Sequence, residues 1–314
     1  MLEGWNTQSV IPSAARNLAL VFEALDEGTR QVRKMVLAAT NPRPATDLDG
    51  PAIEFRRVSM SFDEKLVFED ISFKLGRGET LFLLGVTGTG KSVLLKLTLG
   101  LFKPDSGQIL IQGEDIVPLP EEQLHSIRKH MGMVFQEGAL FDSLSVYDNV
   151  AYRLREEGEK DEARIEQRAR EVLSFVEMEE AIYKMPAELS GGMRRRVAIA
   201  RAIIYEPCIM LYDSPTGGLD PVTAHTINVL IAKMRDVRHV TSLVVTHRIQ
   251  NAYELANFFF SPEKQTLVPI TTDGGSSRIA ATRFLVLRDG GIYFQGKQEE
   301  LAQARDPYLR KFLM

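Results

Sequence analysis

The sequence predicts an α/β fold in which helices cover a mainly parallel β-sheet. Three short apolar runs carry this prediction, because Leu81–Leu84, Cys208–Tyr212 and Leu243–Val245 are continuous in the way of strands buried on both faces. Helical patterns alternate with these runs, around residues 91–101, 163–179, 191–204 and 222–237. Strands that alternate with helices pair in parallel, so we expect one α/β core.

Two further stretches predict strands of a different kind. Ile53–Phe55 and Ile71–Phe73 alternate apolar and polar residues, as half-buried strands do. The stretch 259–282 contains Pro262, Pro269 and a run of small residues, which predicts a loop insertion or a small hairpin there.

The domain organisation follows from length and composition. The chain has 314 residues, of which 44% are hydrophobic and 25% charged, enough for one large domain with appendages. We expect that domain over residues 51–314 and an N-terminal helical extension with a linker over residues 1–50. Ala14–Leu37 carries an apolar stripe at helical spacing, and the prolines of Asn41–Pro44 end it. The extension either packs on the main domain or binds a partner, unless the start codon is misassigned.

Charge, cysteine and hydropathy exclude several classes of protein. The net charge of -4 gives no general attraction to nucleic acid or anionic lipid. The single cysteine, Cys208, allows no intramolecular disulfide, which suits a reducing compartment. No apolar run reaches the roughly 18 residues of a membrane-spanning helix, and the first ten residues do not read as a signal peptide. If the protein serves a membrane, we expect it to act from the cytoplasmic side through a partner.

A phosphate-binding loop follows the first buried strand and precedes a helical pattern. It matches G-x-x-x-x-G-K-[ST] in full, with the residues Gly85, Val86, Thr87, Gly88, Thr89, Gly90, Lys91 and Ser92. Glycines allow backbone N–H groups to surround a triphosphate, and the helix adds its positive N-terminus. Lys91 supplies a charge for the outer phosphates, and Ser92 offers a hydroxyl to Mg²⁺. A chance glycine-rich turn would lack the flanking strand and helix.

Asp213 ends the second buried strand. A carboxylate at the C-terminal end of such a strand can hold Mg²⁺ opposite the phosphate loop, so the sequence predicts a site for Mg-ATP. The alternative for an aspartate in a turn is a helix cap.

A second glycine-rich turn narrows the family. Leu189–Met193 reads LSGGM and precedes an amphipathic helix, in which Ser190 can cap the helix while Gly191 and Gly192 leave N–H groups bare. This resembles the signature motif of the ABC ATPases. The resemblance implies a P-loop NTPase core with a parallel-rich sheet, an antiparallel β subdomain and a small helical subdomain. It also implies two ATP molecules sandwiched between two copies, since in that family the signature of one subunit covers the γ-phosphate bound by the other.

Four further positions match the family in order along the chain. Gln136 resembles the Q-loop glutamine, which contacts Mg²⁺, and Asp220 the D-loop aspartate. His247 resembles the switch histidine that reaches the γ-phosphate, and Phe62 falls where an aromatic ring stacks on the base. The resemblance covers about residues 52–258 and 283–300. The arginines at 194–196 are interpreted as a solvated helix face, and no nucleic-acid partner is expected.

The segment 137–190 should form the helical subdomain, whose groove in transporters receives a coupling helix of the permease. Val134–Arg155 looks like the ATPase subunits of Mla-type and Mce-associated lipid transporters. The resemblance implies an ATP-binding subunit, peripheral on the cytoplasmic face of the inner membrane. It would drive phospholipid or related lipid through an integral permease, with an Mce-type envelope protein as a further partner.

One position departs from the family pattern. Ser214 stands where a glutamate usually serves as general base, and a hydroxyl cannot usefully accept a proton from water near neutral pH. Losing a positioned base typically costs roughly 10²–10⁴ in rate, so we expect an ATP hydrolase of reduced rate. Three interpretations stay open. Hydrolysis is slow but real, or another carboxylate or His247 replaces the base, or this subunit either pairs with a more active one or acts mainly as a nucleotide-gated clamp.

The alternative from another class is a soluble ABC ATPase of DNA repair, chromosome maintenance or translation. Such proteins usually carry two nucleotide domains in one chain, or a long coiled coil between phosphate loop and signature. This chain has one phosphate loop and no coiled-coil stretch before Ser190. The transporter subunit is therefore the leading hypothesis.

Overall fold

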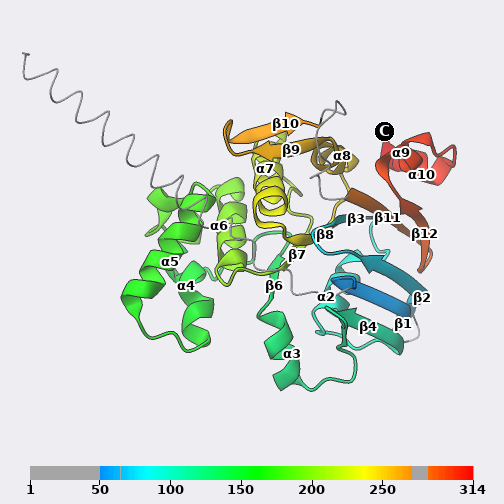
Figure 1. Ribbon diagram of the computed structural model, residues 1–314, viewed down its shortest axis with the longest axis horizontal. Helices are drawn as coiled ribbons and strands as arrows, with labels where there is room; N and C mark the ends of the chain where they lie inside the picture. Colours follow the sequence, from blue (N-terminus) through cyan, green and yellow to red (C-terminus); the bar gives the residue numbers. More distant parts are fainter. Residues whose placement is uncertain (1–49, 64, 271–281, 314) are drawn as a thin grey trace, which may run out of the picture. The chain divides into compact units, whose positions relative to one another are not determined.

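A six-stranded sheet forms the centre of the computed structural model, which describes residues 50–63, 65–270 and 282–313 (Figure 1). The predicted extension, with its helix Ala14–Leu37, lies outside these residues. The strand order is β12-β11-β3-β8-β7-β6, and every neighbouring pair is parallel except β11 and β12. The bounds are β3 (Thr80–Leu84), β6 (Met131–Val134), β7 (Ile209–Asp213), β8 (Thr241–Val245), β11 (Thr282–Arg288) and β12 (Gly291–Gly296).

The central strands are apolar on both sides because helices and a second sheet cover both faces. All five residues of β3 are buried, which confirms the strand predicted there. Leu81 and Leu83 join one hydrophobic cluster, together with Leu94 of α2 (Lys91–Thr98). Phe82 and Leu84 join the other cluster, with residues of α6 (Gly191–Ile203) and α7 (Pro221–Arg238). Side chains that alternate along a strand thus divide the core into two layers.

The half-buried strands belong to a separate antiparallel sheet, ordered β2-β1-β4-β5. Its strands are β1 (Ile53–Phe62), β2 (Lys65–Leu75), β4 (Ser106–Ile111) and β5 (Glu114–Asp115). Phe55 and Phe73 pair across it and stack with their ring centres 4.7 Å apart. This sheet buries its apolar face in the same cluster as α2, so it positions the phosphate loop that precedes that helix.

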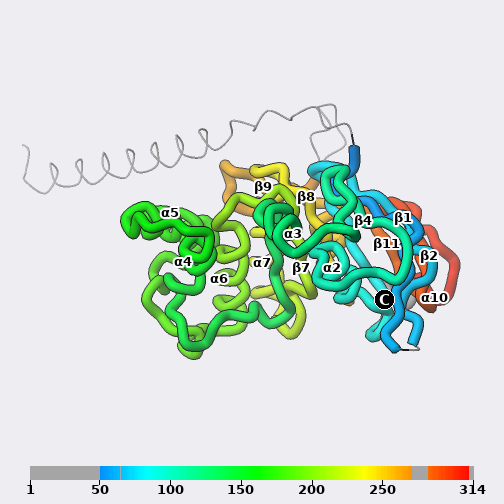
Figure 2. The backbone as a smooth tube through the Cα atoms, turned by 90° about the horizontal axis from the view of Figure 1, so that it is seen from below, coloured from blue at the N-terminus to red at the C-terminus, as the bar shows by residue number. Residues whose placement is uncertain are grey.

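A group of helices lies at the opposite end from the antiparallel sheet (Figures 1 and 2). It contains α4 (Val146–Glu156), α5 (Glu162–Phe175), the short 3-10 turns Glu179–Ala181 and Pro186–Glu188, and α6. Polar side chains begin its helices, since Ser145, Asp161 and Ser190 each accept a hydrogen bond from a backbone N–H in the first turn. The helix α3 (Glu121–Arg128) precedes β6.

The remaining elements follow β8. They are α8 (Ile249–Asn257), β9 (Phe258–Ser261), β10 (Thr266–Pro269), α9 (Gln298–Gln303) and α10 (Pro307–Leu313). β9 and β10 form an antiparallel hairpin within the stretch interpreted as a loop or hairpin, whose residues 271–281 lie outside the described part. Over the described ranges, no helix combines the length and hydropathy needed to cross a bilayer.

Two helices end earlier than their patterns predict. The pattern at 91–101 gives a helix only to Thr98, because Gly100 takes a left-handed conformation with φ 64. The pattern at 163–179 gives α5 only to Phe175, because Glu177 is left-handed with φ 57. Apolar residues continue past both ends. After α5, Val176 and Met178 are buried in the core, whereas Leu101 after α2 is 51% exposed.

Candidate nucleotide site

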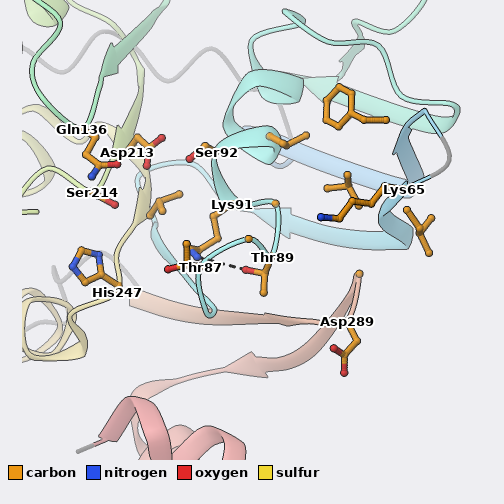
Figure 3. A pocket seen from close by; sticks show the side chains of 18 of the residues that line it. Lys65, Thr87, Thr89, Lys91, Ser92, Gln136, Asp213, Ser214, His247 and Asp289 are labelled. Carbon is orange, nitrogen blue, oxygen red and sulfur yellow. Dashed lines mark hydrogen bonds between the residues drawn. The ribbon is translucent and has the colours of Figure 1, made fainter.

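An open cleft of about 1360 Å³ lies at the carboxyl ends of β3, β7 and β8 (Figure 3). Parallel strands bring their carboxyl ends to one edge of the sheet, so the loops after these three strands meet there. Most of the predicted site residues line this cleft, namely Phe62, Thr87, Gly88, Thr89, Gly90, Lys91, Ser92, Gln136, Asp213, Ser214 and His247.

The phosphate loop has a conformation that only glycine tolerates where α2 begins. Gly90 is the N-cap of α2 with φ 87, and a Cβ there would lie 2.7 Å from the ring of Phe68. The Gly90 carbonyl accepts the first helical hydrogen bond, from Leu94 N at 2.9 Å. Strand β2 therefore presses directly on the start of α2 and aims the N-terminus of the helix at the cleft.

Lys91 lies at the centre of the loop. Its ammonium donates to the carbonyls of Gly85 and Val86, both at 2.8 Å, and reaches Thr89 Oγ1 at 3.5 Å. Burial lowers the pKa of Lys91 from its ordinary value, and the nearby Asp213 carboxylate acts in the opposite direction. Gly85 and Val86 thus hold the lysine by their backbone, while the residues from Thr87 onward face the cleft.

Three oxygen-bearing side chains converge on one side of the cleft. Figure 3 shows Ser92, Gln136 and Asp213 close to one another, from the start of α2, the loop after β6 and the end of β7. A hydroxyl, an amide carbonyl and a carboxylate are hard oxygen donors that suit Mg²⁺. The described residues contain no group of three His, Cys, Asp or Glu able to hold a metal. Three donors of this kind fit an ion such as Mg²⁺ that takes phosphate oxygens and water as its remaining ligands.

Ser214 sits in a strained turn directly after Asp213. Its φ is 48, its N–H donates to Val245 O at 3.0 Å, and its carbonyl accepts from Gly217 N at 2.9 Å. The residue is only 8% exposed. Figure 3 shows Ser214 at the same end of the cleft as Gln136 and His247. The hydroxyl is therefore held where polar side chains from three loops meet.

The other carboxylates of the cleft lie away from Ser214. Among the described residues that line it, these are Asp63 and Asp289. Asp63 lies in the turn between Phe62 and Lys65, and Figure 3 shows Lys65 and Asp289 at the end of the cleft away from Ser214. Of the described carboxylates that line the cleft, Asp213 is the one that Figure 3 shows beside Ser214.

The cleft also contains residues that the sequence did not single out. Lys65 lines it across the β1–β2 turn from Phe62, and proximity to that aromatic residue was the available signal. Asp289 and Gly290 enter from the turn after β11, where Gly290 O accepts a hydrogen bond from Glu69 N at 2.9 Å. No local pattern marks that turn, because only the pairing of β11 with β3 brings it to the cleft.

The signature residues and Asp220 lie elsewhere on the same chain. Ser190 caps α6, accepting from Met193 N at 3.3 Å, and a Cβ on Gly192 would overlap the side chain of Thr223. Asp220 caps α7, accepting from Thr223 N and Val222 N, both at 3.0 Å. The hydrogen bonds from Thr223, supported by Val222, hold the pKa of Asp220 below its ordinary value. These residues are outside the lining of the chain's own cleft.

Similarity to known proteins decides the family. A family model described as ABC transporter matches residues 68–217. The intermembrane phospholipid transport system ATP-binding protein MlaF of Haemophilus influenzae is 32% identical over 261 residues, covering 83% of this chain and 89% of the relative. The chain belongs to the ABC transporter ATP-binding family. MlaF of Escherichia coli K12 is 34% identical over the same length and is covered to 88%.

Other members of the ABC family match over shorter ranges. The probable ribonucleotide transport ATP-binding protein Mkl of Mycobacterium leprae is 42% identical over 203 residues, but this chain covers only 58% of that relative. Among solved structures, the dimeric ATP-binding cassette MJ0796 bound to ADP and Pi has a TM-score of 0.65 and 28% identity, over 78% of this chain and 98% of that chain. This solved cassette therefore shares its fold with most of the chain.

Proposed function

We propose that this protein is the ATP-binding subunit of an ABC transporter, which uses Mg-ATP binding and slow hydrolysis to drive a separate permease. The cleft is the observation that supports this proposal most directly, because Lys91, Asp213 and His247 line it at the ends of three neighbouring parallel strands. Phe62, 39% exposed at the cleft, offers a ring face to a base. The loop and Lys91 bind phosphates, while Ser92, Gln136 and Asp213 hold Mg²⁺, which neutralises phosphate charge when bound.

We infer that two copies act together on each nucleotide. Ser190, Gly191 and Gly192 are outside the cleft of their own chain, and a helix N-terminus with bare N–H groups binds anions. A second copy could present this turn to the phosphates without any change of fold. The dimeric state of the related cassette MJ0796 supports this arrangement.

Ser214 is the reason for expecting slow turnover. Its hydroxyl can orient a water by hydrogen bonding, and the His247 imidazole at the same end of the cleft can accept a proton. Neither is the carboxylate that the family pattern usually has at this position. Binding should be strong nonetheless, because the groups that contact phosphate and metal are all present.

The test is a pair of substitutions at one position. Ser214→Glu should raise the ATP turnover of the purified protein by roughly 10²-fold, because it supplies a general base. Ser214→Gln has almost the same size but accepts no proton, and it should give no such rise. Turnover is measured by phosphate release and affinity by titration with Mg-ATP. Rapid hydrolysis by the wild type, unchanged by Ser214→Glu, would show that no base is missing.

The permease should dock on the aromatic surface beside the helical group. Phe135, Phe141 and Tyr152 are 39%, 44% and 40% exposed, and the rings of Phe141 and Tyr152 lie 4.8 Å apart. Phe135 precedes Gln136, so contact there can reach the metal donors. Exposed aromatic pairs are typical anchors of protein interfaces.

Docking is tested by co-purification from detergent-solubilised membranes. Phe141→Ala with Tyr152→Ala should lose the integral partner while Mg-ATP affinity is kept, because neither residue lines the cleft. Tyr183→Ala is the control, since Tyr183 is 73% exposed on the same group of helices but has no part in this aromatic pair. If the double variant still co-purifies with the integral partner, the permease docks on another surface.

The cargo that we propose is phospholipid or a related lipid. The support is the match to the two MlaF proteins, which runs over nearly their whole length. The Mkl match covers less of that relative, so its ribonucleotide cargo is the less supported alternative. An Mce-type envelope protein is then a further partner, and the protein acts peripherally at the cytoplasmic face of the inner membrane. Mass spectrometry of lipids bound to the purified complex tests the cargo.

A nucleotide-gated clamp is the second candidate, and Ser214 alone favours it. Such a clamp would bind Mg-ATP and dimerise but turn over negligibly. One measurement separates the clamp from the leading proposal. If the protein is a clamp, a non-hydrolysable ATP analogue should support repeated cycles of the permease complex as well as ATP does.

A further inference from the structure

Arg195 is a buried cation whose contacts the nucleotide site does not use. It lies in α6, after the signature glycines, and is only 6% exposed. Its Nη2 donates to the carbonyl of Gly217 at 3.1 Å, whereas its buried Nε has no hydrogen-bond partner among the described residues. Burial lowers the pKa of Arg195 and Glu137 opposes that effect. A buried guanidinium with an unused donor is costly, so it calls for a functional explanation.

The acceptor of this hydrogen bond belongs to the turn that carries Ser214. Gly217 N donates to Ser214 O at 2.9 Å, which closes the turn. A Cβ placed on Gly217 would lie 3.1 Å from Ser214 O and 3.7 Å from His247 Cε1. The backbone that Arg195 contacts is therefore bonded to the Ser214 backbone and lies close to His247.

The rest of this turn is held from α8. Asn251 Nδ2 donates to Thr216 Oγ1 at 2.6 Å, and Arg248, the N-cap of α8, donates from Nη1 to Leu219 O at 3.0 Å. Both donors closely follow His247 in the chain. Arg195 differs because it comes from α6, the helix that continues from the signature and packs on α4 and α5. It therefore ties the turn to the signature helix.

The charge of Glu137, the residue after Gln136, also acts on the Arg195 guanidinium and opposes the effect of burial on its pKa. The hydrogen bond of Arg195 joins two segments, namely α6, which carries it, and the turn 214–217. A shift of about 1 Å between them would break a hydrogen bond of normal length.

We propose that Arg195 is a positioning residue for ATP hydrolysis, which sets the Ser214–Gly217 turn according to the position of the signature helix. The proposal rests on the proposed ATPase function. Hydrolysis needs reacting groups aligned within fractions of an ångström, so a turn released from Arg195 should bind ATP normally and hydrolyse it slowly.

The experiment compares three single substitutions. Arg195→Gln removes the charge, and Arg195→Lys keeps it with a donor that can still reach a carbonyl. Arg196→Gln is the matched control, because Arg196 lies on the same helix turn but makes only an exposed ion pair with Glu177, at 3.3 Å. Each is made in the wild type and in a Ser214→Glu background, where turnover is easier to measure. The readouts are kcat, Mg-ATP Kd, and amide hydrogen exchange of residues 214–220.

Arg195→Gln should lower kcat about 10- to 100-fold, leave Kd within about two-fold, and speed exchange in 214–220. Arg195→Lys should recover part of kcat, and Arg196→Gln should change none of the three. The proposal is overturned if Arg195→Gln keeps kcat, or if exchange rises over the whole of α6 rather than in the turn. Absence of turnover in both backgrounds would instead refute the proposed ATPase function, and exchange would still decide the role of Arg195.

Discussion

At the scale of single residues, the phosphate loop depends on one glycine that packs as tightly as a core side chain. Gly90 combines a left-handed backbone, φ 87, with direct contact to the ring of Phe68. The conformation favours glycine, and the contact leaves no space for a methyl group. Both constraints come from structure outside the loop, since Phe68 belongs to β2.

Gly90→Ala should therefore damage both the fold and the site. A left-handed conformation costs a non-glycine residue about 1–2 kcal/mol, and the clash with Phe68 adds to it. Gly113→Ala isolates the conformational part, because Gly113 has φ 92 and a Cβ there would meet nothing within 4 Å. Thermal unfolding should rank Gly90→Ala below Gly113→Ala, and only the former should weaken Mg-ATP binding. Equal losses in both would mean that the loop yields to the methyl group.

At the scale of elements, a buried amide shapes the loop between β6 and α4. Asn149 is fully buried, and its Nδ2 donates to the carbonyls of Phe141, Leu144 and Ser145 at 2.9–3.0 Å. Its Oδ1 accepts from Phe141 N at 2.8 Å. One side chain thus satisfies the loop that presents Phe141 on the surface.

Asn149→Ala should lower the free energy of unfolding by on the order of 3 kcal/mol, because several buried backbone groups lose their partner. Asp161→Ala removes an exposed helix cap of α5 and should cost only about 1 kcal/mol. Denaturant titration measures both. The loss of permease binding should accompany the first substitution alone, since Phe141 is then free to move. A cost no larger than that of Asp161→Ala would show that water replaces the lost amide.

At the scale of the whole molecule, a buried carboxylate joins α4 to the end of α3. Glu157 is 6% exposed in its side chain, and its oxygens lie 2.6 Å from Lys129 Nζ and 3.2 Å from His125 Nε2. Burial raises the pKa of Glu157, but the Lys129 and His125 partners outweigh it, so the pKa is lowered from its ordinary value. One ionised side chain therefore links the end of α4 to α3.

A carboxyl group whose pKa is lowered in the folded state contributes stability at pH values above its unfolded-state pKa of about 4.3. That contribution is lost as the pH falls through the lower folded-state value. The melting temperature of the wild type should therefore drop between pH 5 and pH 3 more steeply than that of Glu157→Gln. Glu166→Gln, which removes an exposed i,i+4 pair with Arg170, should behave as the wild type does. Parallel curves for all three proteins would contradict a role for Glu157.

The sequence alone determined the features that neighbouring residues encode. Continuous apolar runs mark β3, β7 and β8, because a strand covered on both faces favours apolar side chains along most of its length, with a few polar residues near its ends. The loop from Gly85 to Ser92 was recognisable because its glycines, lysine and hydroxyl stand at fixed spacing. Ser214 was visible as a departure for the same reason.

Only the tertiary structure showed which residues, distant in sequence, lie close together in space. The pairing of β11 with β3 brings Asp289 to the cleft, and the packing of α6 on the turn after β7 brings Arg195 to Gly217. Such contacts leave no periodic trace, since each joins single positions far apart in the chain. The ends of α2 and α5 were missed because left-handed residues stopped them while apolar spacing continued. Local pattern specifies what an element is, and packing specifies what it touches.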